Sequence, residues 1–127
     1  MTGSSAYNVG IDIERAGRFE SVADDQNFGA LFTAEERRYC SSSGDAAASY
    51  AGTWCAKEAI VKALAPWVVL DPRRVTVARS ADDTQVMVSG WSGMPSGVTV
   101  RVTISDRRPL ATAFAVASGP GVAGRSV

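Results

Sequence analysis

The sequence predicts a single α+β domain in which an antiparallel sheet packs against one long helix. Residues 50–64, YAGTWCAKEAIVKAL, consist almost entirely of residue types that favour helix, and only Gly52 opposes it. Residues 74–117 instead contain short runs rich in Val, Thr and Ile, which are separated by turn-forming residues. Because a chain of 127 residues can bury one core but not two, residues 1–127 are expected to form one domain.

A strand and a weak helix are expected at the start of the chain. Residues 6–13 form a mostly apolar run that predicts a strand, with Asp12 near its end. Residues 15–27 predict a weak helix that carries Arg15 and Arg18. A carboxylate inside an apolar strand needs a partner, a metal ion or several hydrogen-bond donors, so Asp12 is a first candidate for function.

Two further helices are predicted from their caps. Thr33 followed by Glu36 forms a capping box, which opens a short helix that runs to residue 39 or 40. Asp45 is the expected N-cap of the long helix. That helix is expected to end before Pro66, because the residue that precedes a proline avoids the helical region.

The second half of the chain predicts an antiparallel meander of short strands. The strands are expected at 74–79, 85–90, 98–105 and 110–117. Turns rich in Gly, Pro, Ser and Asp are expected between them, at 80–83, 92–97 and 106–109. Residues 1–5 and 119–127 are expected to be loose tails.

Composition excludes several classes of chemistry. The chain contains no histidine, which excludes a His-based catalytic triad, a His-ligated zinc site and a histidine general base. Thirteen basic residues balance thirteen acidic ones, so the charge gives no reason to expect a nucleic acid or a membrane as partner. No apolar run approaches the roughly 20 residues that a membrane span requires, and no signal peptide is evident.

The two cysteines, Cys40 and Cys55, fit no metal-ligand spacing. We expect them to be reduced thiols of a cytoplasmic protein. The sequence leaves a disulfide bridge between them open.

The long helix has an apolar arc with charged residues in it and beside it. The arc comprises Trp54, Ile60, Val61 and Leu64. Lys57 falls inside this arc, where a charge is costly unless it is paired. Glu58 and Lys62 are four residues apart and therefore share a neighbouring face. One interpretation is an ordinary surface pair, with Lys57 reaching out to water; the other is a functional cluster.

The functional interpretation combines this helix with the first strand. Asp12 and Glu58 together could hold one hard divalent cation. Proteins usually bind Mg²⁺ in this way, with one or two carboxylates, substrate phosphates and water. Lys57 and Lys62 would then supply positive charge for the phosphate oxygens.

The same segments carry a family resemblance. They are GID at 10–12, RF at 18–19, FTAEE at 32–36 and WCAKEAIVKAL at 54–64. Their order and separation resemble those of the holo-acyl-carrier-protein synthase type of phosphopantetheinyl transferase, over nearly the whole chain. The resemblance implies the phosphopantetheinyl transferase fold, with an antiparallel sheet packed against the long helix.

The resemblance implies a Mg²⁺-dependent transferase that moves the 4′-phosphopantetheine arm of coenzyme A onto a serine of an acyl carrier protein. It implies that Asp12 and Glu58 are the metal ligands, and that Glu58, Lys62 and Lys57 are the catalytic residues. Both lysines would contact the phosphates of coenzyme A, although Lys57 could instead orient Glu58. The serine would lose its proton to Glu58 or to a metal-bound water.

The resemblance also implies partners. Arg18, with Arg15 beside it, is expected to dock the acidic recognition helix of the carrier protein, and the alternative for both is ordinary solvated surface. The family's usual homotrimer, with active sites between subunits, is expected here, with a monomer as the alternative. The setting would be fatty acid or polyketide biosynthesis in the cytoplasm.

Some positions depart from the family pattern and support a second hypothesis. The departures are Thr53, Ala65-Pro66-Trp67, Asp83-Thr84-Gln85 and Asp106, all expected on the nucleotide-binding side. A divergent homologue of the same fold could have lost coenzyme A, and could bind a carrier protein or act on a polyketide-like substrate. The retained acidic pair and lysines favour the transferase.

Overall fold

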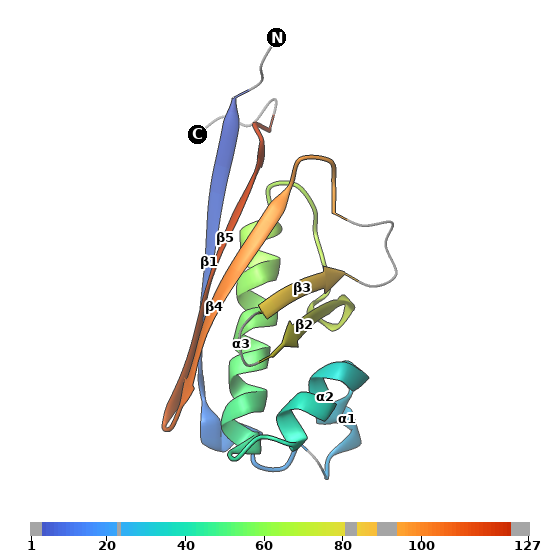
Figure 1. The fold of residues 1–127 in the computed structure, drawn as a ribbon, viewed down its shortest axis with the longest axis vertical. Helices are drawn as coiled ribbons and strands as arrows, with labels where there is room; N and C mark the ends of the chain where they lie inside the picture. Colours follow the sequence, from blue (N-terminus) through green and yellow to red (C-terminus); the bar gives the residue numbers. More distant parts are fainter. Residues whose placement is uncertain (1–3, 23, 81–83, 89–93, 123–127) are drawn as a thin grey trace.

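A computed structural model describes residues 4–22, 24–80, 84–88 and 94–122, with the backbone alone for 85–88 (Figure 1). The elements in chain order are β1 (Ser5–Arg15), the 3₁₀ helix η1 (Ala16–Phe19), α1 (Gln26–Gly29), α2 (Ala34–Ser41), α3 (Ala46–Leu64), the 3₁₀ helix η2 (Pro72–Arg74), β2 (Val75–Arg79), β3 (Thr84–Val88), β4 (Thr99–Arg107) and β5 (Leu110–Pro120). This mixture of helices and antiparallel strands confirms the predicted α+β class.

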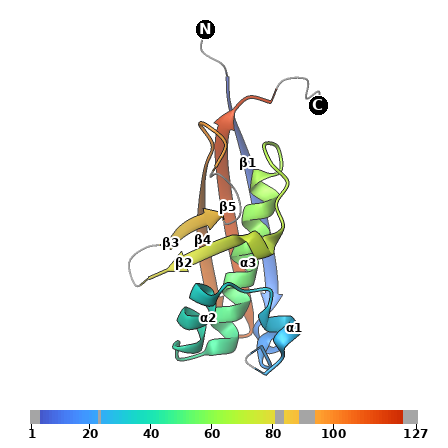
Figure 2. The same cartoon turned by 90° about the vertical axis from the view of Figure 1, so that its right-hand side faces the viewer.

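The described strands form two antiparallel sheets rather than the single meander that the sequence predicted. One sheet has the order β1-β5-β4, and the other is the hairpin β2-β3. Helix α3 covers one face of the three-stranded sheet, and the hairpin and α2 pack on the other side of α3 (Figures 1 and 2). The long helix is buried on nearly all sides. A helix that is apolar all round needs cover on both sides, which explains the second layer.

Small side chains allow α3 to lie close to the sheet. The inner face of β5 consists of Ala111, Ala113, Ala115 and Ala117, all nearly or fully buried. Gly10 is the inner-face residue of β1, and a Cβ there would lie 2.0 Å from the carbonyl oxygen of Ala59. The backbone of β1 therefore touches the backbone of α3, a contact that only glycine permits at this position.

The predicted helix caps are confirmed. Thr33 Oγ1 accepts a hydrogen bond from the backbone N–H of Glu36 at 3.4 Å, and Glu36 Oε1 accepts one from the N–H of Thr33 at 2.9 Å. Asp45 caps α3 through its side chain. The helix ends at Leu64, just before Pro66, as expected.

The weak helix predicted over 15–27 is wrong. Strand β1 continues to Arg15, which pairs with Leu110 of β5. A single 3₁₀ turn follows, and α1 begins only after Asp25, whose side chain accepts hydrogen bonds from two backbone N–H groups of α1. The sequence suggested one helix over this segment. Instead, its first residue pairs with β5, and Asp25 begins a separate helix near its end.

The ordered sheet also extends beyond the boundaries expected for the tails. Ser5, expected in the first tail, pairs with Pro120, expected in the second, so each tail contributes residues to a strand. The remainder of the tails, 1–3 and 123–127, lies outside the described residues. No helix in the described part of the chain is long and apolar enough to cross a membrane.

Both cysteines are free and buried, in agreement with the prediction of reduced thiols. Burial raises the pKa of the Cys40 thiol to about 11 and that of Cys55 to about 12. At neutral pH both are therefore protonated and unreactive.

Candidate active site

Strand β1 runs alongside α3 and presents alternate side chains to it. Asn8 Nδ2 donates hydrogen bonds to the carbonyl oxygens of Lys62 and Ala63, each at 3.0 Å. Two residues further on, Gly10 lies against Ala59, one turn earlier in the helix. Two strand residues span about 6.6 Å and one helical turn about 5.4 Å. Each inward residue of β1 therefore meets the preceding turn of α3.

Asp12 is the next inward residue and lies beside the turn of α3 that carries Glu58. Lys62 Nζ donates to the carbonyl oxygen of Ile11 at 3.0 Å and is 3.4 Å from Asp12 Oδ1. The Lys62 side chain is 51 % exposed and that of Asp12 is 20 % exposed, so both can be reached from solvent. The structure thus brings together three of the predicted site residues, Asp12, Glu58 and Lys62.

Glu58 lies in an acidic environment. Burial raises the pKa of its carboxyl above the ordinary value, and the negative charge of Asp12 raises it further. The charge of Lys62 opposes this shift, and Glu14 adds a smaller upward contribution to the pKa. A cation between the carboxylates would relieve this repulsion.

The donor set fits a magnesium ion that shares its coordination with a substrate. In the described part of the chain, no group of three or more His, Cys, Asp or Glu side chains is arranged to hold a metal ion alone. Mg²⁺ commonly takes one or two carboxylates from a protein and completes its shell with phosphates and water. Asp12 and Glu58 supply that number.

Lys57 is not at this site, and the predicted phosphate contact has to be corrected. Its side chain is 0 % exposed, and Nζ donates to Glu36 Oε1 and to the carbonyl oxygen of Val75, each at 2.7 Å. The other oxygen of Glu36 accepts a hydrogen bond from the N–H of Val77 at 2.8 Å. The pair joins α2, α3 and β2, so Lys57 neither binds phosphate nor reaches water.

Glu14 lies one step beyond Asp12 on the inward face of β1 and binds Arg18. Arg18 Nη1 is 2.7 and 2.6 Å from the two carboxylate oxygens of Glu14. A hollow at the edge of the sheet is lined by Ile13, Glu14, Arg15, Arg18 and Leu110. Sequence reasoning identified both arginines but missed Glu14. Its signal was its place two residues after Asp12, because such residues share one face of a strand.

Two positions that depart from the family pattern meet across the fold. Arg79 links them, with Nη1 3.3 Å from Thr53 Oγ1 and Nη2 2.7 Å from Asp106 Oδ2. Gly52 makes room, since a Cβ there would lie 2.7 Å from the Cβ of Asp106. The Arg79 side chain is 10 % exposed. Asp106 is therefore balanced by an arginine that sequence reasoning did not single out.

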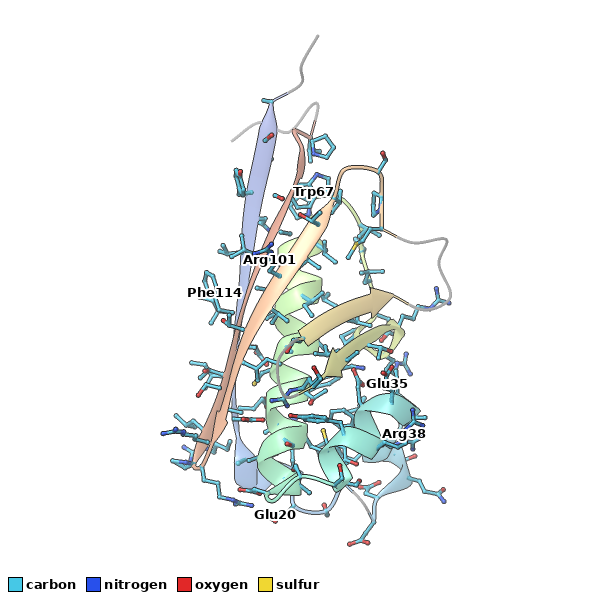
Figure 3. All side chains as sticks on the ribbon, in the orientation of Figure 1. Glu20, Glu35, Arg38, Trp67, Arg101 and Phe114 are labelled. Atoms are coloured by element: carbon cyan, nitrogen blue, oxygen red, sulfur yellow. The ribbon has the colours of Figure 1, made fainter. Side chains whose placement is uncertain are left out.

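The segment after α3 is fixed to the end of β5. Trp67 Nε1 donates to the carbonyl oxygen of Pro120 at 2.8 Å, and its ring covers Gly119 (Figure 3). The segment Asp83-Thr84-Gln85 also departs from the family pattern. Asp83 lies outside the described residues, and Thr84 begins β3. Trp67 thus gives this turn a defined anchor.

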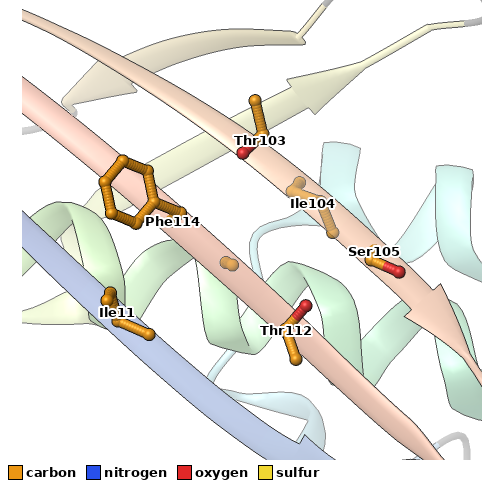
Figure 4. Close-up of a pocket in the computed structure, with 7 residues that line it drawn as sticks. Ile11, Thr103, Ile104, Ser105, Thr112 and Phe114 are labelled. Atoms are coloured by element: carbon orange, nitrogen blue, oxygen red, sulfur yellow. The ribbon is translucent and has the colours of Figure 1, made fainter.

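The outer face of the three-stranded sheet carries exposed apolar side chains along β1 and β5, whereas β4 presents polar and charged ones there. Its large exposed side chains are Tyr7, Val9, Ile11 and Ile13 of β1 with Leu110 and Phe114 of β5. Phe114 points away from α3 (Figure 3). Ile11, Phe114 and Thr103 line one hollow across the three strands (Figure 4). An apolar face of this extent marks a surface suited to protein contact.

Fold and site together define a small α+β protein with an acidic pair and an exposed lysine, a set suited to a phosphate-bound cation. The family model for the 4′-phosphopantetheinyl transferase superfamily matches residues 8–115. The chain belongs to this superfamily.

Curated and solved relatives agree with this assignment. A holo-[acyl-carrier-protein] synthase of Chlamydia trachomatis is 33 % identical over 117 residues, covering 87 % of this chain and 98 % of the relative. The acyl carrier protein synthase (AcpS) structure of Mycobacterium tuberculosis is 27 % identical, with a TM-score of 0.67. The match covers 89 % of this chain and 97 % of the M. tuberculosis chain. An ACPS–CoA complex of Chronobacterium ammoniagenes, 21 % identical with a TM-score of 0.74 and coverages of 91 % and 99 %, supports the fold.

Proposed function

We propose that this protein transfers the 4′-phosphopantetheine arm of coenzyme A onto a serine of an acyl carrier protein. The observation that carries the proposal is the meeting of Asp12, Glu58 and Lys62 where β1 passes α3. A full-length relative named as a holo-[acyl-carrier-protein] synthase supports the same activity.

Asp12 and Glu58 are the residues that would hold Mg²⁺ against the diphosphate of coenzyme A. When bound, the ion would neutralise charge that builds on the phosphate oxygens. Lys62 is partly exposed and exchanges its present contacts with Ile11 and Asp12 for a phosphate oxygen. Its charge then stabilises the transition state and the leaving group.

The transfer itself is an attack by the serine oxygen on the β-phosphorus. The new O–P bond forms as the bond to the adenosine 3′,5′-bisphosphate breaks, and the serine proton passes to a base. Glu58, or a water molecule beside it, would take this proton, since the chain contains no histidine to act as the base. Catalysis otherwise rests on positioning and electrostatics.

The carrier protein is proposed to dock at the hollow beside Glu14. Arg18, which is 61 % exposed, and the neighbouring Arg15 face solvent there. Arg18 contacts Glu14, which shares the inward face of β1 with Asp12, whereas Arg15 points to the opposite face. An acidic helix bound to Arg18 would therefore present its serine close to the site. Their charge complements that of an acidic partner.

We further propose that the apolar outer face of the sheet is covered by further copies of this chain, in a homotrimer. Ile11, Phe114 and their apolar neighbours on β1 and β5 are exposed on that face. Phe114→Asp should shift the oligomer toward monomer in light scattering, whereas Arg38→Asp, on the opposite side of the molecule, should not (Figure 3). A monomeric wild-type protein would contradict this proposal.

The cytoplasm is the proposed location. Cys40 and Cys55 are both free, and buried free thiols are typical of a reducing compartment.

The mass of an apo carrier protein tests the activity. After incubation with this protein, coenzyme A and Mg²⁺, the carrier should gain the mass of one phosphopantetheine. No gain across several carrier proteins would contradict the transferase, and would favour a homologue that binds carriers without using coenzyme A. Titration calorimetry with coenzyme A would then show whether binding or chemistry is missing.

A further inference from the structure

The last turn of α3 carries Lys62, and a proline deprives this turn of a main-chain donor. In an α-helix the carbonyl oxygen of Lys62 would accept a hydrogen bond from the N–H four residues later. Residue 66 is proline and has no N–H to donate. The carbonyl oxygen of Lys62 is left with the N–H of Ala65, at the long distance of 3.3 Å.

Asn8 of β1 supplies the missing donors. Trp67 lies four residues after Ala63, but its N–H donates instead to the carbonyl oxygen of Leu64 at 2.9 Å. Asn8 Nδ2 donates to the carbonyl oxygens of Lys62 and Ala63, each at 3.0 Å. A carboxamide nitrogen carries two N–H groups, which matches these two acceptors. Strand β1 therefore completes the hydrogen bonding of the last turn of α3.

We propose that Asn8 is a positioning residue for Lys62, which fixes the last helical turn against β1 so that the ammonium group reaches the diphosphate of coenzyme A from a fixed base. This inference rests on the proposed function, because it takes Lys62 as the group that contacts phosphate.

Strand β1 holds Lys62 at two points, and only one of them persists in the proposed reaction. Lys62 Nζ donates to the carbonyl oxygen of Ile11 at 3.0 Å and is 3.4 Å from Asp12 Oδ1. Both contacts are given up when Nζ moves to a phosphate oxygen. The bond from Asn8 ends on the main chain of Lys62, so that movement leaves it in place. Without Asn8, a helix end that already lacks main-chain donors would be freer to fray.

The contact next to Asn8 along β1 gives α3 less directional support. Gly10 has no side chain, and its backbone lies directly against the backbone of Ala59. Packing of this kind is non-directional, whereas a hydrogen bond weakens steeply when its geometry changes. The two hydrogen bonds of Asn8 therefore set the position of the last turn of α3 along the strand.

Steady-state kinetics with an apo carrier protein test the positioning role. Asn8→Leu removes both donors at similar size and should lower kcat about tenfold, because a misplacement of about 1 Å can cost up to a hundredfold. The KM for the carrier protein should not change. Where Asn8→Leu does not fold, Asn8→Ser, which keeps a single donor, takes its place with a smaller expected loss in kcat. The matched control is Ser43→Ala, which removes a 2.9 Å hydrogen bond to the carbonyl oxygen of Cys40 at the end of α2 and should leave kcat unchanged.

Two double variants separate positioning of Lys62 from a general loss of stability. In titration calorimetry Asn8→Leu should weaken coenzyme A binding, but it should have no further effect in a Lys62→Met background. Pro66→Ala restores the N–H four residues after Lys62, so adding it to Asn8→Leu should recover most of the lost kcat. A full effect of Asn8→Leu in the Lys62→Met background, or no recovery with Pro66→Ala, would overturn the positioning role.

Two outcomes distinguish this role from the transferase activity itself. If wild type modifies the carrier protein and Asn8→Leu does so with the same kcat, the positioning role of Asn8 is overturned and the activity stands. If wild type neither binds coenzyme A nor modifies any carrier protein, the activity is overturned, and the role of Asn8 with it.

Discussion

Replacing Lys57 by Met should be one of the most destabilising single changes in this protein. The side chains of Lys57 and Glu36 are both 0 % exposed and meet at 2.7 Å. Met fills a similar volume, so the change removes the charge and two hydrogen bonds with little loss of packing. It leaves the carboxylate of Glu36 buried without its cation and the carbonyl of Val75 without its donor.

Removing one partner of a buried ion pair typically costs about 3–5 kcal/mol. Glu36 keeps two backbone donors, the N–H groups of Thr33 and Val77, which holds the expected cost of Lys57→Met within that range and not above it. For a domain of this size the change corresponds to a drop in Tm of roughly 10–20 °C. Urea unfolding followed by tryptophan fluorescence measures the free energy directly.

The control is Lys62→Met, the same substitution on the same helix at a side chain that is 51 % exposed. It should cost about 0.5 kcal/mol or less. A loss below about 1 kcal/mol for Lys57→Met would refute the assignment of this pair as a structural ion pair.

Three further predictions concern the site and its supports. Because the pKa of Glu58 is raised above 4.5, the folded protein holds this proton more tightly than the unfolded chain does. Wild type should therefore lose stability relative to Glu58→Gln as the pH rises from about 4.5 through the raised pKa. A stability difference that does not change with pH in urea unfolding would contradict this. Gly10→Ala should cost at least about 3 kcal/mol, since its Cβ would meet the carbonyl of Ala59, whereas Gly17→Ala, with nothing within 4 Å, should be nearly neutral in thermal unfolding. Arg79→Met should cost about 1–3 kcal/mol in urea unfolding by leaving a partly buried aspartate unpaired, and an unchanged midpoint would show that this ion pair contributes nothing.

Local signals predicted the parts of the fold that local interactions determine. The capping box at Thr33, the N-cap at Asp45 and the break at Pro66 each act within one turn of helix, and each is confirmed. The division of the strands between two sheets depends on how α3 is covered. The sequence suggested a single apolar arc on that helix, whereas its alanines allow burial on nearly every side.

The sequence likewise predicted only part of the candidate site. Asp12, Glu58 and Lys62 were predicted from spacing and family pattern, and the structure brings them together. Lys57 was misplaced because its partner, Glu36, lies 21 residues away in the chain, and the capping role of Glu36 did not show that it also turns inward. Glu14 was missed because its contact with Arg18 depends on the 3₁₀ turn that follows β1, where the sequence predicted a helix.

The central claim is that Asp12 and Glu58 form the metal-dependent centre of a phosphopantetheine transfer. The most direct measurement is the mass of an apo carrier protein incubated with coenzyme A, Mg²⁺ and either wild-type protein or Glu58→Gln. We predict complete modification by wild type, and none by Glu58→Gln although its circular dichroism spectrum is native. Modification at the wild-type rate by Glu58→Gln would contradict the claim.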